Sequence, residues 1–395
     1  MACLYFFNCD NDLALANFSP GFTPPGHIRM MMGELAPLPL DWAEEDRAAC
    51  VASMLHGPSA DADILSSLGE VRPWGWSPAA CHRLRQMGVP EHLLPSSSEL
   101  LEIRRLSSRE RAVELLSQMR EDGVCSDFQS VFCLYEAQVE EALCRWPRTI
   151  LKAPWSGSGK GLRYGQGGRE DTLMGWCRRV ISQQGGVVVE PLYDKLYDLA
   201  MEFWSDGKGC VTYQGLSLFE THPNGAYSGN LLMPEAEKQA WLDQFVPVEQ
   251  SLAVRLWLER RLSSLVGKAY RGYLGVDMML TAPPTPEGEK FCPKVGGKRP
   301  MLVGEVQKAD DERLASVGEV QKTVLHPMVE VNLRMTMGMV SILLQRRQPR
   351  GFHGVFRLDY FSDPADLEAD NARRASHSST FRILASGAHY RAYLE

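Results

Sequence analysis

The sequence predicts an α+β protein made of two or three packed lobes, and three observations lead to this fold class. First, its 395 residues, 44% of them hydrophobic, exceed what a single core usually holds, roughly 250–300 residues. Second, short apolar runs typical of strands recur along the chain, as in "TILKAP", "VVVEPL", "YLGVDMML" and "MVEVNLRM". Third, amphipathic helical segments separate them; Ala112, Leu115, Leu116 and Met119, for example, share one helical face.

Composition excludes several classes of function. The formal net charge is −7 and no block of lysine and arginine stands out, so no nucleic-acid partner is expected. No apolar run approaches the roughly 18–20 residues that cross a bilayer, and the N-terminus lacks the basic start of a signal peptide. The ten cysteines include no CxxC pair, which argues against a metal cluster or a disulfide framework. These features predict a cytoplasmic protein with reduced thiols and no membrane partner.

The first hundred residues predict an α/β domain. A buried strand is expected over residues 1–8, followed by a polar turn, "NCDND". A helix should begin at the Ser-Pro of "SPAACHRL", and two more at Ser98 and at Ser107 or Ser108. The carboxyl end of a strand is where α/β sheets bind ligands, so the polar turn is a candidate substrate contact; an ordinary turn is the alternative.

The stretch "TILKAPWSGSGKGLRYGQGG", residues 149–168, suggests a phosphate-binding loop but matches neither common motif. A P-loop requires glycine where Pro154 stands and a hydroxyl where Gly161 stands. A dinucleotide fingerprint requires an acidic residue placed for a ribose, and Glu190 follows a strand without closing such a unit. The remaining pattern is a strand that ends in Lys152, a glycine–serine loop, and a strand that ends in Glu190.

The rest of the chain predicts a helix at "DTLMGWCRRVISQQ", a hairpin that turns at Asp206-Gly207, and one long amphipathic helical stretch over residues 235–270. Strands follow at "YLGVDMML" and "MVEVNLRM". Between them, residues 281–323 are rich in Pro, Gly, Lys and Glu and predict an exposed, mobile insertion. The tail, 351–395, predicts a strand pair at "FHGVFRLDYF" and a polar segment.

Taken in order, these elements resemble the ATP-grasp superfamily over about residues 100–345. The resemblance implies an ATP-grasp fold in which two α+β lobes clamp ATP, preceded by an N-terminal α/β domain. It divides the chain into an N-terminal domain (1–105), a central lobe with the glycine-rich flap (106–190) and a C-terminal lobe with the metal site (191–395).

The resemblance also implies roles for the residues around the loop. Lys152 matches a lysine that contacts phosphates, where a fixed charge is most useful. Arg109 stands where similar enzymes, such as D-alanine–D-alanine ligase, carry a phosphate-binding lysine; a plain surface arginine is the alternative. Glu190 and the backbone of Leu192 would read adenine, and Asp198 would hold the ribose. The flap, in which backbone N–H groups approach phosphate oxygens, comprises Ser156, Gly157, Ser158, Gly159 and Gly161.

The metal site is expected on the last two strands of that pattern. "YLGVDMML" resembles the superfamily's G-x-D-x-M strand and "MVEVNLRM" its E-x-N-x-R strand. Residues two apart on a strand point the same way, so Glu330 and Asn332 share a face and Asp277 joins them from the neighbouring strand. Oxygen ligands of this kind suit Mg²⁺, one or two ions, beside ATP. Arg334, and as a second candidate Arg271, would stabilise the transferring phosphoryl group.

The function that the resemblance implies is an ADP-forming ligase. It would convert a carboxylate to an acyl phosphate, which an amine attacks to form an amide. The expected partners are therefore small molecules, amino acids or peptides among them, with a homodimer as the expected assembly. A phosphotransferase that uses the same clamp and a non-catalytic ATP-binding protein stay open as alternatives.

Overall fold

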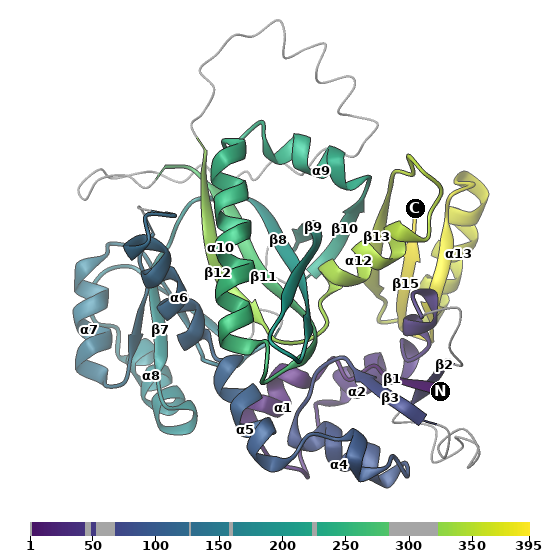
Figure 1. The fold of residues 1–395 in the computed structure, drawn as a ribbon, viewed down its shortest axis with the longest axis horizontal. Helices are drawn as coiled ribbons and strands as arrows, with labels where there is room; N and C mark the ends of the chain where they lie inside the picture. The colour runs from purple at the N-terminus through teal and green to yellow at the C-terminus, as the bar shows by residue number, and fades with distance from the viewer. Residues whose placement is uncertain are drawn as a thin grey trace, which may run out of the picture.

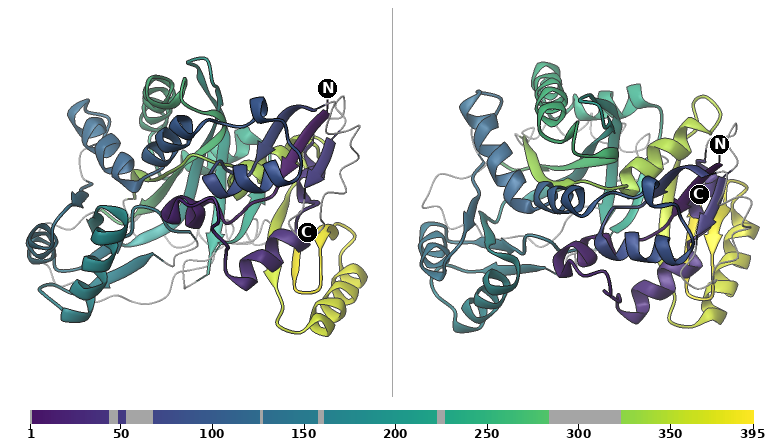
Figure 2. Two further views of the ribbon diagram at one scale, coloured as in Figure 1. Left: turned by 90° about the horizontal axis from the view of Figure 1, so that it is seen from below. Right: turned by 60° about the horizontal axis from the view of Figure 1, so that its bottom comes forward.

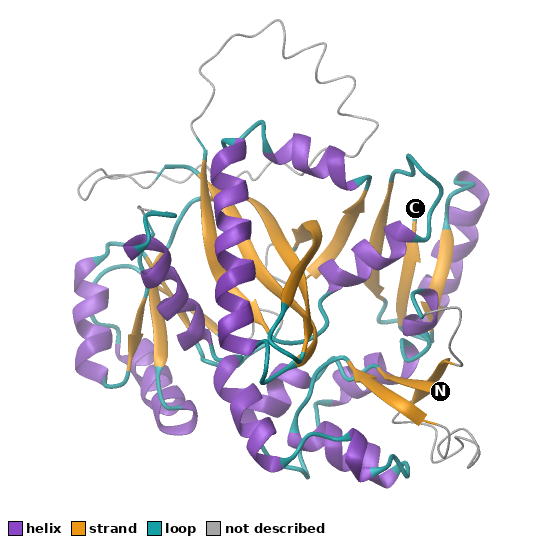
Figure 3. Ribbon diagram, viewed as in Figure 1, coloured by secondary structure: helices purple, strands orange, loops and turns teal. Residues whose placement is uncertain are grey.

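The computed structural model describes residues 2–43, 49–52, 68–125, 128–157, 161–222, 227–283 and 323–395. Three β-sheets organise these residues (Figure 1), with strand orders β2-β1-β3, β4-β7-β5-β6 and β12-β11-β8-β9-β10-β13-β15-β14. Helices flank each sheet (Figure 3). The structure is therefore α+β, which confirms the predicted fold class.

The N-terminal part holds a small parallel sheet and short helices. Its strands are β1 (Ala2–Phe6), β2 (Ala49–Ala52) and β3 (Leu68–Pro73). Its helices are α1 (Asn11–Asn17), α2 (Gly26–Glu34), α4 (Pro78–Gln86) and α5 (Ser97–Leu106), with the short 3₁₀ turns η1 (Leu38–Asp41) and η2 (Glu91–Leu93). The serine hydroxyls at 77 and 96 accept backbone N–H groups at the starts of α4 and α5, which caps both helices.

The central part is a four-stranded lobe, seen at the left of Figure 1. Its strands are β4 (Val131–Cys133), β5 (Thr149–Lys152), β6 (Leu162–Gly165) and β7 (Val187–Pro191). Two helices, α7 (Glu136–Arg145) and α8 (Asp171–Gln184), pack on it, and α6 (Arg109–Glu121) precedes it. Buried Leu151, Val187 and Val189 share a core with Leu143 and Trp176 of these helices.

The largest sheet has eight strands. They are β8 (Lys195–Asp206), β9 (Val211–Thr221), β10 (Tyr227–Leu232), β11 (Arg271–Thr281), β12 (Val324–Asn332), β13 (Gly354–Tyr360), β14 (Arg382–Ser386) and β15 (Tyr390–Leu394). Its helices are α9 (Glu235–Leu242), α10 (Val248–Val266), α12 (Met337–Arg346) and α13 (Pro364–His377). No helix in the described part of the chain is long and apolar enough to span a membrane.

The two faces of β8, β11 and β12 differ sharply in polarity. On one face, buried Phe203, Val276 and Met278 share a core with Trp257 and Leu258 of α10. The other face carries carboxylates and amides, because side chains alternate along each strand and paired residues share a face. In the register, Asp277 is opposite Ala200 of β8 and Glu330 of β12, and Gly275 is opposite Glu202 and Asn332. The polar face thus gathers Asp198, Glu202, Asp277, Glu330 and Asn332.

The N-terminal sheet packs on its own helix α4 on one face, where Leu4 and Phe6 share a core with Leu84, and on C-terminal elements on the other. Its Cys3, Tyr5 and Phe7 belong to one core with Met339 of α12 and Ala392 of β15. Figure 2 shows the N-terminal strands beside the C-terminal elements, and both chain ends lie on this side of the molecule. The N-terminal strand β1 is therefore buried in part by elements from the C-terminal end of the chain.

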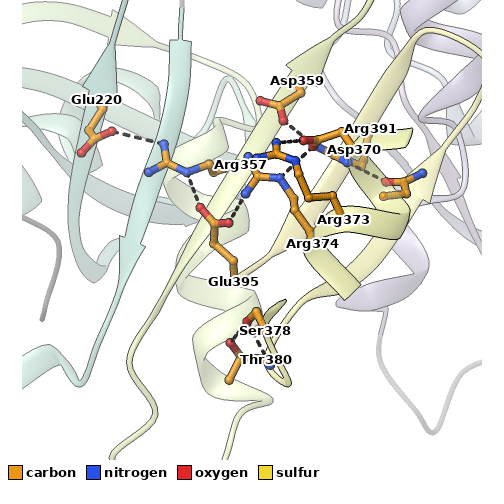
Figure 4. A network of polar contacts seen from close by, with 11 residues as sticks. Glu220, Arg357, Asp359, Asp370, Arg373, Arg374, Ser378, Thr380, Arg391 and Glu395 are labelled. Atoms are coloured by element: carbon orange, nitrogen blue, oxygen red, sulfur yellow. Dashed lines mark hydrogen bonds and ion pairs between the residues drawn. The ribbon is translucent and has the colours of Figure 1, made fainter. Parts of the chain in front are cut away.

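A network of charged side chains joins α13 to strands of the C-terminal part (Figure 4). Arg391 of β15 has no exposed side-chain surface and contacts Asp359 and Asp370, each at 2.7 Å. Arg374 of α13 also binds Asp370, at 2.8 Å, and reaches Glu395 at the chain end. A guanidinium buried this deeply is tolerated because carboxylates surround it.

Several elements differ from the sequence prediction. The helical stretch of 235–270 is two helices, since Pro247 precedes α10 and its ring cannot continue α9. The polar turn after β1 opens helix α1, and the cap of α5 is Ser96 rather than Ser98. The tail contains α13 and the β14–β15 hairpin where a polar segment was expected, and β13 stands where a strand pair was expected. The insertion of residues 281–323 lies mostly outside the described residues, which resume at 323.

Candidate active site

The centre of the candidate site is a pair of opposed carboxylates. Asp277 of β11 faces Glu330 of β12 in the antiparallel ladder, and Asn332 lies two residues further along β12. Loss of hydration raises the pKa of Asp277 to about 7, and the nearby charge of Glu330 adds to this rise. The amide of Asn332 and the guanidinium of Arg334 act in the opposite direction. Two acids placed so close repel each other unless a cation joins them.

Arg109 connects this pair to the glycine-rich loop. It begins α6 and is nearly buried, and its guanidinium donates to Glu330 Oε2 at 2.9 Å. It also donates to the hydroxyl of Ser156 at 2.6 Å and to the carbonyls of Ala153 and Ser156 at 2.6 and 3.1 Å. The structure thus places Arg109 in the site, with both terminal nitrogens of its guanidinium engaged by the loop and by Glu330.

Lys152 and Glu190 form a second charged pair in the central lobe. Lys152 Nζ lies 2.7 Å from Glu190 Oε2, and both side chains are less than 10% exposed. The two come from the neighbouring strands β5 and β7. Lys152 is also close enough to His326 of β12 to help burial lower the pKa of that histidine to about 3. The lysine of one lobe therefore faces a strand of the other.

The loop after β5 turns tightly and approaches the N-terminal part. Ala153 N–H donates to the Gly161 carbonyl at 2.9 Å, and a Cβ on Gly161 would fall 2.2 Å from Ser156 Oγ, so only glycine fits there. A Cβ on Gly157 would meet Asp12 Oδ2 at 3.4 Å. The expected flap residues Ser158 and Gly159 lie outside the described residues.

Arg334 ties the N-terminal part to the site. Its guanidinium donates to both carboxylate oxygens of Asp12, at 2.8–3.1 Å. Asp12 comes from α1, which follows the first strand, so the polar segment singled out in the sequence does reach this region. The positive charge of Arg334 also lowers the pKa of Asp277. Chain segments more than 300 residues apart, near residues 12 and 334, therefore meet beside the carboxylate pair.

Three further residues that the sequence placed in the site are Leu192, Asp198 and Arg271, and each has its own surroundings. The N–H of Leu192 donates to the Arg148 carbonyl at 2.9 Å, which leaves its carbonyl as the backbone group available to a base. Asp198 lies on the polar face, where it binds Lys195 Nζ at 2.5 Å and accepts from Thr221. Arg271 is six residues from Asp277 along β11, about 20 Å at roughly 3.3 Å per residue. This separation argues against Arg271 as the second candidate, beside Arg334, for the transferring phosphoryl group.

Sequence reasoning missed Glu202. It is 1% exposed on the polar face, and neither carboxylate oxygen makes a well-formed hydrogen bond within the described residues, although the Thr336 side chain lies close enough to act on it. Burial raises the pKa of Glu202 to about 8, while Thr336 lowers it and Asp277 raises it further. A Cβ on Gly338 at the start of α12 would fall 2.2 Å from Glu202 Oε1. An acid inside the apolar run "LAMEFW" was the available signal, because such a group is costly to bury.

The donor set of the carboxylate pair fits Mg²⁺. No group of three or more His, Cys, Asp or Glu side chains that could hold a metal occurs among the described residues. Mg²⁺ does not require one, since it binds through one or two carboxylates and completes its shell with phosphate oxygens and water. Two opposed carboxylates, one of them with a raised pKa, and a neighbouring amide oxygen match that preference.

No protein-family model and no curated protein matches the chain. Solved structures of similar fold include N5-carboxyaminoimidazole synthetase from Staphylococcus aureus complexed with ADP, at a TM-score of 0.48 and 11% identity, covering 100% of this chain and 93% of that one. Biotin carboxylase from Campylobacter jejuni gives 0.47 and 12%, covering 100% and 86%. D-cycloserine synthetase gives 0.45 and 11%, covering 87% and 98%. These neighbours are ATP-grasp enzymes; each TM-score is below 0.5 and each identity is 12% or less, so they assign no family or activity to this chain.

Proposed function

We propose that this protein is an ATP- and Mg²⁺-dependent carboxylate–amine ligase that forms an amide through an acyl phosphate. The observation that carries the proposal is the opposed pair Asp277 and Glu330, in an arrangement that also brings together Arg109 and Arg334. Carboxylates for a divalent ion beside fixed cations are what a phosphoryl-transfer site requires, because catalysis there is mostly positioning and electrostatic stabilisation.

In this proposal Asp277, Glu330 and Asn332 would hold Mg²⁺, which offsets negative charge on the phosphate oxygens when bound. Lys152 binds phosphate from the central lobe, and the backbone of Ser156, Gly157 and the loop that follows covers it. The loop includes Ser158, Gly159 and Gly161. Arg109 holds that loop against Glu330, as its four hydrogen bonds support.

The remaining residues would orient the nucleotide and the reacting groups. Glu190 and the carbonyl of Leu192 face the adenine amine, and Asp198 binds a ribose hydroxyl. Arg334, held by Asp12, stabilises charge on the transferring phosphoryl group. A cation anchored by two or more hydrogen bonds is preorganised, which is when it contributes most to the rate.

The reaction balances in two steps. A substrate carboxylate oxygen attacks the γ-phosphorus of ATP, the bond to the bridging oxygen breaks, and ADP leaves with that electron pair. The amine nitrogen then attacks the acyl carbon, orthophosphate leaves, and the nitrogen loses a proton to solvent or to a nearby carboxylate. No side chain forms a covalent bond, so the chain acts by binding and by charge. A cytoplasmic location and a homodimer remain predictions.

The test is a screen of amino acids and dipeptides, alone and in pairs, for ATP-dependent release of ADP and orthophosphate. If the protein is a ligase, ADP and orthophosphate should form only when a carboxylate and an amine are both present. Mass spectrometry should then detect the amide. Asp277→Asn and Glu330→Gln should abolish turnover, whereas Glu140→Gln on the surface of the central lobe should not. ADP formation with a phosphorylated product and no amine dependence would instead establish a phosphotransferase. ATP binding without any ADP would establish a non-catalytic protein.

A further inference from the structure

A cavity lies between the N-terminal sheet and the large sheet, apart from the carboxylate pair. Its volume is about 280 Å³, close to the lower end of the roughly 300–1,000 Å³ typical of small-molecule pockets. The walls come from the ends of β1 and β3, from η1 and η2, from Trp204 near the end of β8 and from the first residues of β11. Elements far apart in the sequence therefore build one enclosure.

The lining of this cavity is strongly aromatic. Four tryptophans contribute to it, together with Phe7 and Tyr273; they are Trp42, Trp74, Trp76 and Trp204. Trp204 and Tyr273 pack edge to face with centroids 4.6 Å apart, and Phe7 and Trp74 do so at 5.0 Å. Rings held in these orientations offer faces and edges to a further ring, which favours an aromatic ligand over an aliphatic one.

Charged groups stand at one side of the same cavity. Glu70 of β3 binds Arg72 at 3.1 Å and Arg271 at 2.5 Å, so its carboxylate is shared by two guanidiniums. Both guanidiniums also lie over the Trp204 ring, at 5.7 and 5.6 Å from its centroid. The Arg271 side chain is 53% exposed, against 17% for Arg72, so Arg271 is the group that a ligand meets first. A planar guanidinium of this kind binds carboxylates well.

The cavity and the candidate active site lie along the same strand face. Residues 271, 273, 275 and 277 share one face of β11, since they alternate with the buried residues between them. Tyr273 and Met335 line the cavity; Tyr273 is two residues from Gly275, and Gly275 is paired with Asn332. Met335 is fixed there because its N–H donates to the Trp74 carbonyl at 2.7 Å. A ligand in the cavity thus has one end toward the carboxylate pair and the other toward Arg271.

We propose that this cavity binds a small aromatic organic acid, with the ring among the tryptophans and the carboxylate at Arg271. A carboxylate at Arg271 is about 20 Å along the strand from Asp277, too far to be phosphorylated there. The cavity is therefore a binding site separate from the carboxylate pair. Aromatic amino acids fall within its ligand class, because their α-amine adjoins the carboxylate and stays near Arg271.

Tryptophan fluorescence provides a test that needs no turnover, because four of the nine tryptophans line the cavity. The probes are L-phenylalanine and 3-phenylpropionate, with 3-phenylpropionamide lacking the charge and propionate lacking the ring. The two ring-bearing acids should quench or shift the emission. The Kd taken from this change should be at least about tenfold lower than that of either control probe. Arg271→Met should remove the preference for the acid over the amide. Arg178→Met, an exposed arginine paired with one glutamate in the central lobe, should leave it unchanged.

The outcomes separate this proposal from the ligase itself. Asp277→Asn should keep the fluorescence response while losing turnover, so an inactive protein that still binds the acids supports the cavity and overturns only the activity. No response to either ring-bearing acid up to about 10 mM overturns the proposal. Equal affinity for acid and amide overturns the role of Arg271, and equal affinity for propionate overturns the role of the ring.

Discussion

Asp277 and Glu330 stand opposite each other in the β11–β12 ladder, and the charge of Glu330 contributes to the raised pKa of Asp277. Arg109 binds only Glu330 of the two, at 2.9 Å. Without a ligand, the two acids therefore differ in their contribution to the stability of the fold. The proposed metal would nevertheless need both.

This difference predicts opposite stability effects from two isosteric changes. Asp277→Asn removes a poorly solvated acid and should raise the free energy of unfolding at pH 8 by about 1 kcal/mol or more, since each pKa unit corresponds to about 1.4 kcal/mol. Glu330→Gln should lower it by about 1–3 kcal/mol, because nearly buried Arg109 loses its anion. Urea unfolding measures both, and both variants should lack turnover. The same sign for the two variants would contradict the assigned geometry.

The pair Lys152 and Glu190 predicts that stability and nucleotide binding can be separated. Lys152→Met leaves Glu190 buried without its partner and should cost about 3–5 kcal/mol. The double variant Lys152→Met, Glu190→Leu should recover most of that loss, because no uncompensated charge remains. It should nevertheless raise the KM for ATP or reduce kcat at least about tenfold, equivalent to roughly 1.4 kcal/mol. A double variant with unchanged kinetic constants would remove both residues from the nucleotide site.

Glu202 predicts a pH dependence of stability. Its pKa of about 8 in the folded protein lies above the ordinary value of 4.5, so the folded state holds the proton more tightly. Its contribution to stability should therefore be complete below about pH 4.5 and be lost as the pH rises to about 8. The charged groups acting on it are Asp277, which raises the pKa, and Arg334 and Lys238, which lower it.

The measurement is the difference between wild type and Glu202→Gln in urea unfolding from pH 5 to pH 9. Because Gln does not titrate, this difference isolates Glu202 from Asp277, which titrates in the same range. The variant should gain stability relative to wild type as the pH increases. A difference that does not change with pH would show that Glu202 is not held in its protonated form.

The buried Arg391 predicts a large structural cost at the C-terminal end. Arg391→Met leaves Asp359 and Asp370 with fewer partners and should lower the free energy of unfolding by about 3 kcal/mol. Arg382→Met, on the adjacent strand β14, removes an exposed pair at 3.4 Å and should change it by less than about 0.5 kcal/mol. Thermal unfolding followed by circular dichroism compares the two. Equal effects would mean that the network in Figure 4 contributes little.

The sequence predicted the strands of the site well because each has a local signal. The runs that became β5, β7, β11 and β12 are apolar, and their polar exceptions, such as Asp277 and Glu330, stand out against that background. Hairpin β8–β9 was found from Asp206-Gly207, where Gly207 adopts the left-handed φ of +71° that glycine tolerates. Helix α8 begins and ends at the predicted residues.

The contacts between distant segments could not be predicted in the same way. Arg334 was expected at a phosphoryl group, but nothing local indicates that Asp12 meets it from the other end of the chain. Arg271 shows the same problem in reverse, since its place in "AYRGYLGVD" suggested a role at the transferring phosphoryl group and its partner is Glu70. The break at Pro247 was also missed, because the amphipathic pattern runs across the proline. Helix α13 was missed because the tail is strongly polar.

The alternation of side chains on β11 has a consequence for insertions and deletions. Val276 and Met278 point into the packed interior, while Asp277 between them points to the opposite side. Removing Val276 would slide the residues before it by a single position and exchange their two sides. Leu274 would then stand on the side that carries Tyr273 and Gly275, and a shift that included Asp277 would turn its carboxylate toward α10. Because alternate residues of β11 face the interior and the site, an insertion or deletion in this strand disturbs both at once. We therefore expect β11 to be the segment least tolerant of length variation.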